Sequence, residues 1–272
     1  MLNSYFESKD FVLYLGDAIE ILNQIEEKSI DLIFADPPYF LSNDGITCQS
    51  GKMVSVNKAK WDESRGFEED LDFTNKWLKT CRRVLKDDGT MWISGTLHII
   101  YKVGYLLEVN GYDIINDIIW FKPNAPPNLS CKYFTHSHEI VLWARKSNES
   151  KHLFNYEKMK NWNDPKDKLK NENKQMRSVW SIPLLSKKEK KFGKHPTQKP
   201  LELLNRIIIS SSKEKDVVLD PFVGSGTTGI ICNLYGRKFI GIDNNKDYLD
   251  LAIKRIKDNE YNRTLLYFPN EN

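Results

Sequence analysis

Four consecutive residues, Asp36-Pro37-Pro38-Tyr39, place a carboxylate, two prolines and an aromatic ring directly after a short apolar run at 30–35. Such a run predicts a buried strand, and open α/β sheets bind ligands beyond the carboxyl ends of their strands. Proline has no N–H group and a fixed φ, so the two prolines predict a stiff turn with free carbonyls. The turn is therefore a candidate for direct contact with a substrate.

The groups of this turn suit chemistry on the exocyclic amine of a nucleobase. Its nitrogen is a poor nucleophile because the lone pair is delocalised into the ring. The Asp36 carboxylate and the Pro37 carbonyl would each accept one N–H and free the lone pair, and charge-assisted hydrogen bonds are the strong kind. Tyr39 would stack on a base extruded from the duplex. Taken alone, the four residues also fit a plain strand end with a helix-capping Asp.

A second motif, DPFVGSGTTG at 220–229, lies between a predicted strand and a predicted helix. Gly224, Gly226 and Gly229 fit the fingerprint of dinucleotide-binding turns, and Asp243 ends the next predicted strand. An acid at that position holds ribose hydroxyls in a nicotinamide site or in an S-adenosylmethionine site. The amine-binding turn favours S-adenosylmethionine, since a nicotinamide enzyme has no use for it.

The elements that position these motifs read as βαβ units, which predicts an α/β fold. Hydrophobic periodicity predicts strands at 11–15, 31–34, 90–94, 114–120, 139–144, 217–219 and 239–242. It predicts helices at 18–24, 67–85, 97–109, 201–211, 227–234 and 248–256. A proline-rich stretch at 122–130 can be neither helix nor central strand. We interpret the polar stretch 40–62 as a mobile active-site loop.

Composition excludes several classes of protein. The 272 residues are 40% hydrophobic and contain no apolar run of about 18 residues, so we expect one domain, 1–272, and no membrane span. The N-terminus has no signal-peptide pattern, which indicates a cytoplasmic protein. The four cysteines lack CxxC spacing. The His136-x-His138-Glu139 stretch offers no further ligand, and we expect no metal.

Charge is distributed unevenly although the net charge is only +3. Residues 151–194 contain thirteen Lys or Arg against five Asp or Glu. That pattern is typical of a nucleic-acid contact surface and equally of a solvated lysine-rich loop. We interpret 121–196 as containing an inserted DNA-recognition region. The candidate DNA contacts are Lys52, Lys58, Lys122, Asn124, Asn128 and Tyr133, although turn chemistry explains the amides equally well.

The combination of DPPY near the N-terminus with DPFVGSGTTG near the C-terminus resembles the β-group of DNA amino-methyltransferases, in which the catalytic motif precedes the cofactor motif. The resemblance spans residues 11–257. It implies a Rossmann-like seven-stranded methyltransferase sheet, circularly permuted, with S-adenosylmethionine as methyl donor. It also implies adenine N6 as the usual acceptor, because the related cytosine-N4 enzymes more often have Ser in place of Asp36.

The resemblance also assigns residues by position. It implies catalytic roles for Asp36, Pro37, Pro38 and Tyr39. It implies cofactor contacts from Asp17, Asp36, Thr197, Lys199, Asp220, Phe222, Gly224, Gly226, Thr227 and Asp243. Within this set, Thr197 and Lys199 would approach the methionine carboxylate, and Asp36 would serve both the target amine and the cofactor.

A narrower resemblance rests on FLSN at 40–43, NLSC at 128–131, YFTHS at 133–137 and WARK at 143–146. These segments are similar to the second adenine methyltransferase of Dpn-like, GATC-specific restriction systems. This narrower resemblance implies action on duplex and single-stranded DNA, a restriction nuclease for the same site and a homodimer. GANTC-specific adenine enzymes share the framework. Methylation of cytosine N4, RNA or a protein glutamine, and an inactive DNA-binding module, stay open as alternatives.

Overall fold

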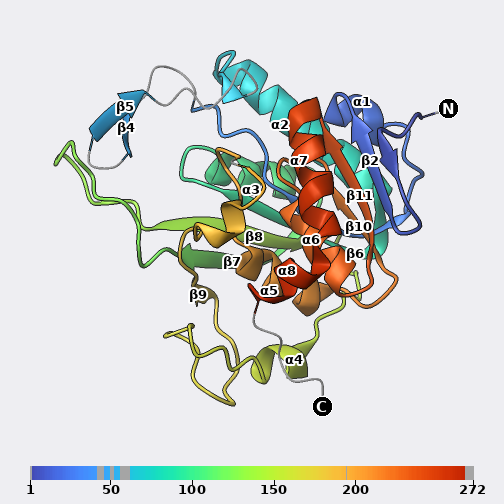
Figure 1. Cartoon of the computed structure of the whole chain (residues 1–272). Coiled ribbons are helices and arrows are strands. Elements are labelled where there is room, and N and C mark those ends of the chain that lie inside the picture. The colour runs from blue at the N-terminus through green and yellow to red at the C-terminus, as the bar shows by residue number, and fades with distance from the viewer. Residues whose placement is uncertain (1, 42–45, 50–51, 56–61, 194, 267–272) are drawn as a thin grey trace.

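The computed structural model describes residues 2–41, 46–49, 52–55, 62–193 and 195–266. A large mixed sheet is covered by helices on both faces (Figure 1). Its strands are β1 (Phe6–Glu7), β2 (Phe11–Leu15), β3 (Ile30–Ala35), β6 (Leu85–Gly95), β7 (Asp113–Phe121), β8 (His138–Arg145), β9 (Val179–Ser181), β10 (Val217–Asp220) and β11 (Lys238–Asp243). The expected α/β class is confirmed.

Within the described residues, the sheet has nine strands in the order β1-β2-β11-β10-β3-β6-β8-β7-β9. The strands from β2 to β6 in this order run parallel, and β8 runs antiparallel to both of its neighbours. The seven predicted strands are all present. The difference from the expected seven-stranded sheet comes from two short edge strands, β1 and β9, which are too short to show a period in the sequence.

The helices are α1 (Ala18–Leu22), α2 (Phe67–Val84), α3 (Ile100–Val109), α4 (Tyr156–Lys160), α5 (Leu201–Ser211), α6 (Thr227–Leu234), α7 (Lys246–Lys257) and α8 (Asn259–Arg263). The predicted bounds of α5 and α6 are confirmed to the residue, and those of α2 to within one residue. The short helices α4 and α8 were not predicted, because one turn of helix leaves little periodic signal.

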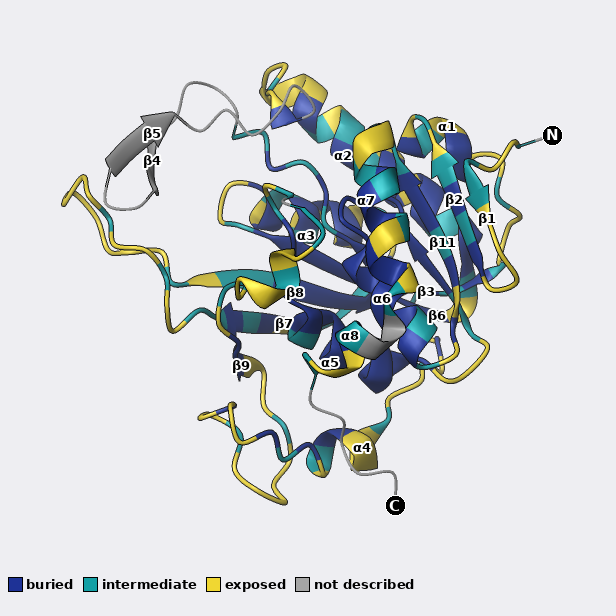
Figure 2. Cartoon of the chain, viewed as in Figure 1, coloured by how far each residue is buried: buried dark blue, intermediate teal, exposed yellow. Residues whose placement is uncertain are grey.

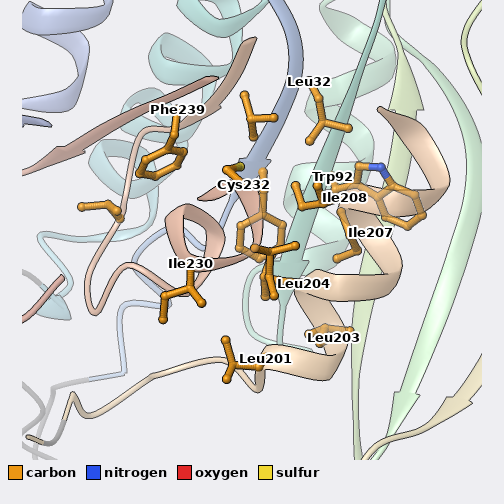
Figure 3. Packing of buried hydrophobic residues seen from close by; sticks show 14 of the residues in the cluster. Leu32, Trp92, Leu201, Leu203, Leu204, Ile207, Ile208, Ile230, Cys232 and Phe239 are labelled. Atoms are coloured by element: carbon orange, nitrogen blue, oxygen red, sulfur yellow. The ribbon is translucent and has the colours of Figure 1, made fainter. Parts of the chain in front are cut away.

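Alternation along β3 shows how the layers are held together. Leu32 and Phe34 belong to the apolar cluster formed with α5, α6 and α7, whereas Ile33 and Ala35 belong to the cluster formed with α1, α2 and α3. Successive side chains of a strand point to opposite faces, so the continuous apolar run 32–35 fills both cores. Figure 3 shows the first cluster, in which α5 and α6 pack over the sheet. In Figure 2 the central strands, which lie between the two clusters, are coloured as buried.

Two stretches differ from the predictions. Residues 87–89 were expected to end a helix, but they lie inside β6, opposite a register shift in β3 between Ile30 and Leu32. Because of this irregularity, the polar residues 87–89 have no pairing partner in β3. In the expected loop 40–62, β4 (Ile46–Gln49) and β5 (Lys52–Ser55) form a separate two-stranded sheet. The remainder of its central part, including 42–45 and 56–61, lies outside the described residues.

The two halves of the chain meet at the centre of the sheet. β3 precedes the turn at 36–39, called the catalytic turn here for its predicted role. β3 pairs in parallel with β10, which precedes the glycine loop, through the partners Leu32 and Val218. In the part of the chain that the structure describes, no helix has the length and apolar character needed to cross a membrane.

Candidate active site

Four acids lie at one edge of the sheet, as the motif spacing predicted. β2, β11, β10 and β3 are parallel neighbours, so their carboxyl ends lie together. Asp36 follows β3, Asp220 and Asp243 end β10 and β11, and Asp17 lies two residues beyond β2. Ligands of open α/β sheets bind at this edge. The sheet thus brings both sequence motifs to one site.

Asp36 is bound through both of its carboxylate oxygens. The Tyr39 hydroxyl donates to Oδ1 at 2.6 Å, and the Lys199 ammonium donates to Oδ2 at 2.7 Å. Lys199 Nζ also donates to the Tyr39 hydroxyl oxygen at 2.9 Å. Burial raises the pKa of Asp36, while the Lys199 ammonium favours its ionised form. Burial lowers the pKa of Lys199, but the nearby carboxylates outweigh burial and raise it, so the ammonium stays charged.

A second carboxylate, Glu139 of β8, lies beside this pair. Its Oε2 is 3.7 Å from Lys199 Nζ and accepts from Ser94 at 3.4 Å. Its Oε1 accepts from Lys122 at 2.5 Å. Two carboxylates and two ammonium groups therefore balance in a largely buried cluster, where an unpaired charge would be strongly unfavourable. In the sequence, Glu139 stood out only as a potential metal ligand beside His136 and His138. Within the described residues, no group of three potential metal ligands exists.

The ring of Tyr39 is turned into the protein and is only 5% exposed. Burial and the neighbouring carboxylates raise the pKa of Tyr39 well above its ordinary value, so its hydroxyl is a neutral donor to Asp36. Stacking on an extruded base requires this ring to move away from Asp36. The stacking role of Tyr39 stays a prediction.

Asp62 holds the backbone that follows the catalytic turn. Its Oδ1 accepts from the N–H groups of Tyr39 at 2.7 Å and Phe40 at 2.9 Å, and its Oδ2 accepts from Leu41 at 3.3 Å. Phe40 has φ +56, in the left-handed region that a bulky residue rarely adopts. The carboxylate, 1% exposed, thus fixes an unusual conformation. Sequence reasoning did not single out Asp62, because its distance in sequence from the turn gave no signal.

A cavity of about 620 Å³ adjoins the catalytic turn. Its walls come from the glycine loop, the ends of β2 and β11, the turn before α5, and the first half of α2 with the residues that precede it. Among the predicted cofactor contacts, those that line it are Asp17, Asp36, Thr197, Lys199, Phe222, Gly224, Thr227 and Asp243. Pro38 and Phe40 line it as well. The volume is in the range of a small-molecule site.

Asp220 and Gly226 are not among the lining residues; both support the glycine loop. Asp220 accepts from the Thr228 hydroxyl at 2.5 Å and the Phe222 N–H at 3.0 Å. Burial raises the pKa of Asp220 to about 7. Gly226 has φ +75, and a Cβ there would lie 2.6 Å from the Cβ of Ala252. Only glycine fits this close approach of α6 to α7.

Asp243 and His195 face the glycine loop. Asp243 Oδ2 accepts from the Gly224 N–H at 2.8 Å, and burial raises its pKa to about 6. Burial lowers the pKa of His195 to about 4, so the imidazole is neutral at pH 7. Its ring packs on Tyr248 with centroids 4.2 Å apart. His195 therefore forms an uncharged wall of the cavity, and its Nδ1 accepts from the Thr197 N–H at 3.3 Å.

Comparison with known proteins agrees with this geometry. The family model described as DNA methylase matches residues 30–254. The chain belongs to the DNA methylase family. It is 52% identical to the Type II methyltransferase M2.LlaDCHI of Lactococcus lactis subsp. cremoris, covering 94% of this chain and 93% of the relative. It is 50% identical to the Type II methyltransferase M2.DpnII of Streptococcus pneumoniae, covering 96% of both.

A solved structure extends the comparison to the cofactor. The M1.HpyAVI–SAM complex is 28% identical, with a TM-score of 0.64 over 91% of this chain and 99% of that one. The predicted resemblance to DNA amino-methyltransferases is thereby confirmed, and the protein is an S-adenosylmethionine-dependent DNA methyltransferase. The circular permutation of the methyltransferase sheet stays a prediction.

The cavity of this methylase fits S-adenosylmethionine chemically. Asp243 lines it with a carboxylate, and each carboxylate oxygen has more than one acceptor site for ribose hydroxyls. Phe222, held edge-on by Trp77 with centroids 5.5 Å apart, provides an apolar wall. Lys199, expected to approach the methionine carboxylate, lines the cavity but gives its hydrogen bonds to Asp36 and Tyr39.

The predicted DNA contacts of the methylase lie in different settings. Lys122 pairs with Glu139 at the active site. The side-chain Oδ1 of Asn124 accepts from the Leu184 N–H at 2.8 Å, so this side-chain amide joins two segments of the region 121–196. The Asn128 amide is used within its own turn, whereas Tyr133 is 60% exposed. Lys58 lies outside the described residues, as does the side chain of Lys52.

Proposed function

We propose that this methylase transfers a methyl group to N6 of an adenine extruded from duplex DNA, at GATC, as the modification enzyme of a Type II restriction system. One observation carries the proposal for the acceptor: a largely buried Asp36 carboxylate, paired with Lys199, at the edge of the cofactor-sized cavity. The support for GATC is the resemblance of residues 40–43, 128–131 and 133–137 to Dpn-like enzymes, together with 50% identity to M2.DpnII.

In the proposed reaction, Asp36 accepts one N–H of the adenine amine and the Pro37 carbonyl accepts the other. Bound S-adenosylmethionine supplies an electrophilic methyl group on its sulfonium. As the N–C bond forms and the methyl–sulfur bond breaks, the nitrogen releases one proton toward Asp36. Burial raises the pKa of Asp36, which makes it a better proton acceptor. Lys199 keeps the carboxylate ionised before transfer.

Tyr39 completes the proposed site by moving its ring from Asp36 onto the face of the extruded adenine. The hydrogen bond of 2.6 Å to Asp36 would then be replaced by one from the substrate amine. Pro38, which lines the cavity, would keep the turn stiff during this exchange. Extrusion is required because the amine cannot be reached inside a stacked duplex.

The proposal extends to the organisation of the protein. We propose a single methyltransferase domain, 1–272, with target recognition in 121–196 and an active-site loop at 40–62. From the resemblance, we further propose that the methylase accepts single-stranded DNA, forms a homodimer, needs no metal, acts in the cytoplasm and shares its site with a restriction nuclease. The basic stretch 151–194 supports DNA contact in this region.

The test is methyl transfer from labelled S-adenosylmethionine to three unmethylated duplexes that contain one GATC, one GANTC or neither site. Single strands of each sequence and a chelator-treated sample run in parallel, and the products are digested to nucleosides. We expect N6-methyladenine in the GATC substrate alone, and none with Asp36→Asn. Label in GANTC would overturn the proposed site, and N4-methylcytosine would overturn the proposed acceptor. Binding of S-adenosylmethionine without methyl transfer to any substrate would overturn the proposed catalytic activity.

A further inference from the structure

One surface feature of the methylase lies mostly outside the site described above. Residues 122–137, here called the finger, connect β7 to β8 and project well beyond the sheet (Figure 1). Phe134 on the finger is 97% exposed, and its neighbour Tyr133 is 60% exposed. The finger is largely exposed along its length (Figure 2). A fully exposed phenylalanine on a projection is a feature of binding surfaces, because water solvates the ring poorly.

The finger has a defined internal structure. At its stem, the Lys122 N–H donates to the Ser137 carbonyl at 2.7 Å. Near its tip, Asn128 closes the turn from both ends of its amide: Nδ2 donates to the Tyr133 carbonyl at 2.7 Å, and Oδ1 accepts from the Ser130 N–H at 3.0 Å. The ring of Phe134 is thus presented by an ordered loop. Preordering reduces the entropy lost when such a ring binds.

The stem of the finger is connected to the catalytic carboxylate. Lys122 pairs with Glu139 at 2.5 Å, Glu139 lies 3.7 Å from Lys199, and Lys199 binds Asp36 at 2.7 Å. Phe134 is five residues from Glu139, which allows a reach of up to roughly 17 Å for an extended chain. That exceeds the depth of either groove of the duplex, about 8.5 Å for the major and about 7.5 Å for the minor groove. The finger can therefore enter the duplex while Asp36 stays beside the target base.

The charge of the finger favours DNA as its partner. Besides Lys122, which pairs with Glu139, the finger includes Lys132 and no Asp or Glu. A basic segment that ends in an aromatic ring matches a polyanion whose bases offer flat apolar faces. Minor-groove and architectural proteins use apolar side chains as wedges between base steps.

We propose that Phe134 inserts into the duplex beside the target adenine and fills the stack that the extruded base leaves. The inference rests on the proposed function, since it assumes transfer to a base taken out of a duplex. Phe134 then compensates for the loss of stacking and prolongs the extruded state. It makes no contact with the cofactor, and it acts before the chemical step.

The experiment compares Phe134→Ala with Phe134→Trp, which keeps a flat ring. Tyr101→Ala is the matched control, because Tyr101 is 70% exposed on α3, outside the finger. Each variant receives two duplexes with the target sequence, one fully paired and one with an abasic site opposite the target adenine. The second duplex has lost the pairing that opposes extrusion. A third duplex with 2-aminopurine at the target position reports extrusion by fluorescence without methyl transfer.

We expect Phe134→Ala to lower kcat/KM at least tenfold on the paired duplex and to weaken the 2-aminopurine signal. On the abasic duplex the loss should shrink to less than threefold. Phe134→Trp and Tyr101→Ala should stay within threefold of the parent on both. An equal loss on both duplexes, or no loss on either, would overturn the wedge. If the parent fails on the GATC duplex, the proposed site is wrong, and the wedge is tested on the duplex that the parent does methylate.

Discussion

Replacement of Asp62 by Asn tests how the catalytic turn is held in place. The change keeps the size of the side chain and removes its charge. Two bonds to Oδ1, from Tyr39 and Phe40, become bonds to a neutral oxygen, and the amide nitrogen of Asn would face the Leu41 N–H. Hydrogen bonds to a charged acceptor contribute about 1.5–3 kcal/mol against about 0.5–1.5 kcal/mol for neutral pairs. The two bonds to Oδ1 each weaken by about 1.25 kcal/mol, and the long 3.3 Å bond from Leu41 adds a smaller loss, so the total is about 3 kcal/mol.

That loss falls on a strained backbone. Phe40, at φ +56, would relax when its N–H is released and would carry Tyr39 and the turn with it. If half of the energy appears in the barrier, about 1.5 kcal/mol, methyl transfer slows roughly tenfold. The remainder destabilises the fold, which lowers the Tm by several degrees. Asp62 is thus a positioning residue that acts through the backbone of the turn.

The assay is single-turnover methyl transfer with saturating cofactor, alongside thermal unfolding. Asp216→Asn is the matched control, because Asp216 also accepts from a backbone N–H, that of Lys213 at 2.9 Å, but lies at the opposite end of β10. We expect slower transfer in the Asp62 variant and an unchanged rate in the control. An Asp62→Asn rate within twofold of the parent would refute this account of the turn.

Three further outcomes follow from the structure. Burial raises the pKa of Asp243 to about 6, so S-adenosylmethionine affinity should fall as pH drops below about 6, and Asp243→Asn should flatten that profile. Gly226→Ala should unfold at lower temperature and lose cofactor affinity, since its Cβ would lie 2.6 Å from that of Ala252. Arg206→Met leaves Asp167 buried without its 2.6 Å partner and should lower the free energy of unfolding by about 3–5 kcal/mol.

Each of these has a measurement and a contrary result. Calorimetric titration of S-adenosylmethionine at pH values from 5 to 8 measures the predicted fall in cofactor affinity. An affinity that does not change with pH would contradict that prediction. In the cofactor-free protein, Asp243 affects stability in the opposite direction to cofactor affinity. Because its pKa is raised in the folded state, its contribution to the free energy of unfolding increases as pH falls. Thermal and urea unfolding measure the other two. A Gly226→Ala protein with parental Tm, or an Arg206→Met protein with parental stability, would show that the surroundings relax.

The sequence alone determined the framework and the chemistry of this methylase. Strand 30–35 is predicted because its continuous apolar run at 32–35 must fill cores on both faces, and helix 201–211 because its period is unbroken. The motifs at 36–39 and 220–229 specified an amine acceptor and a nucleoside cofactor through local chemistry. Such signals are local, so no knowledge of distant contacts is needed to find them.

Tertiary structure alone decided what surrounds those motifs. Asp62 reaches the catalytic turn, Glu139 joins Lys199, and Lys199 meets Asp36 across 163 positions of sequence. Tyr39 buries its ring on Asp36 instead of presenting it to solvent. Partnerships of this kind depend on which strands become neighbours. That order results from packing the whole sheet, and local residue spacing carries no record of it.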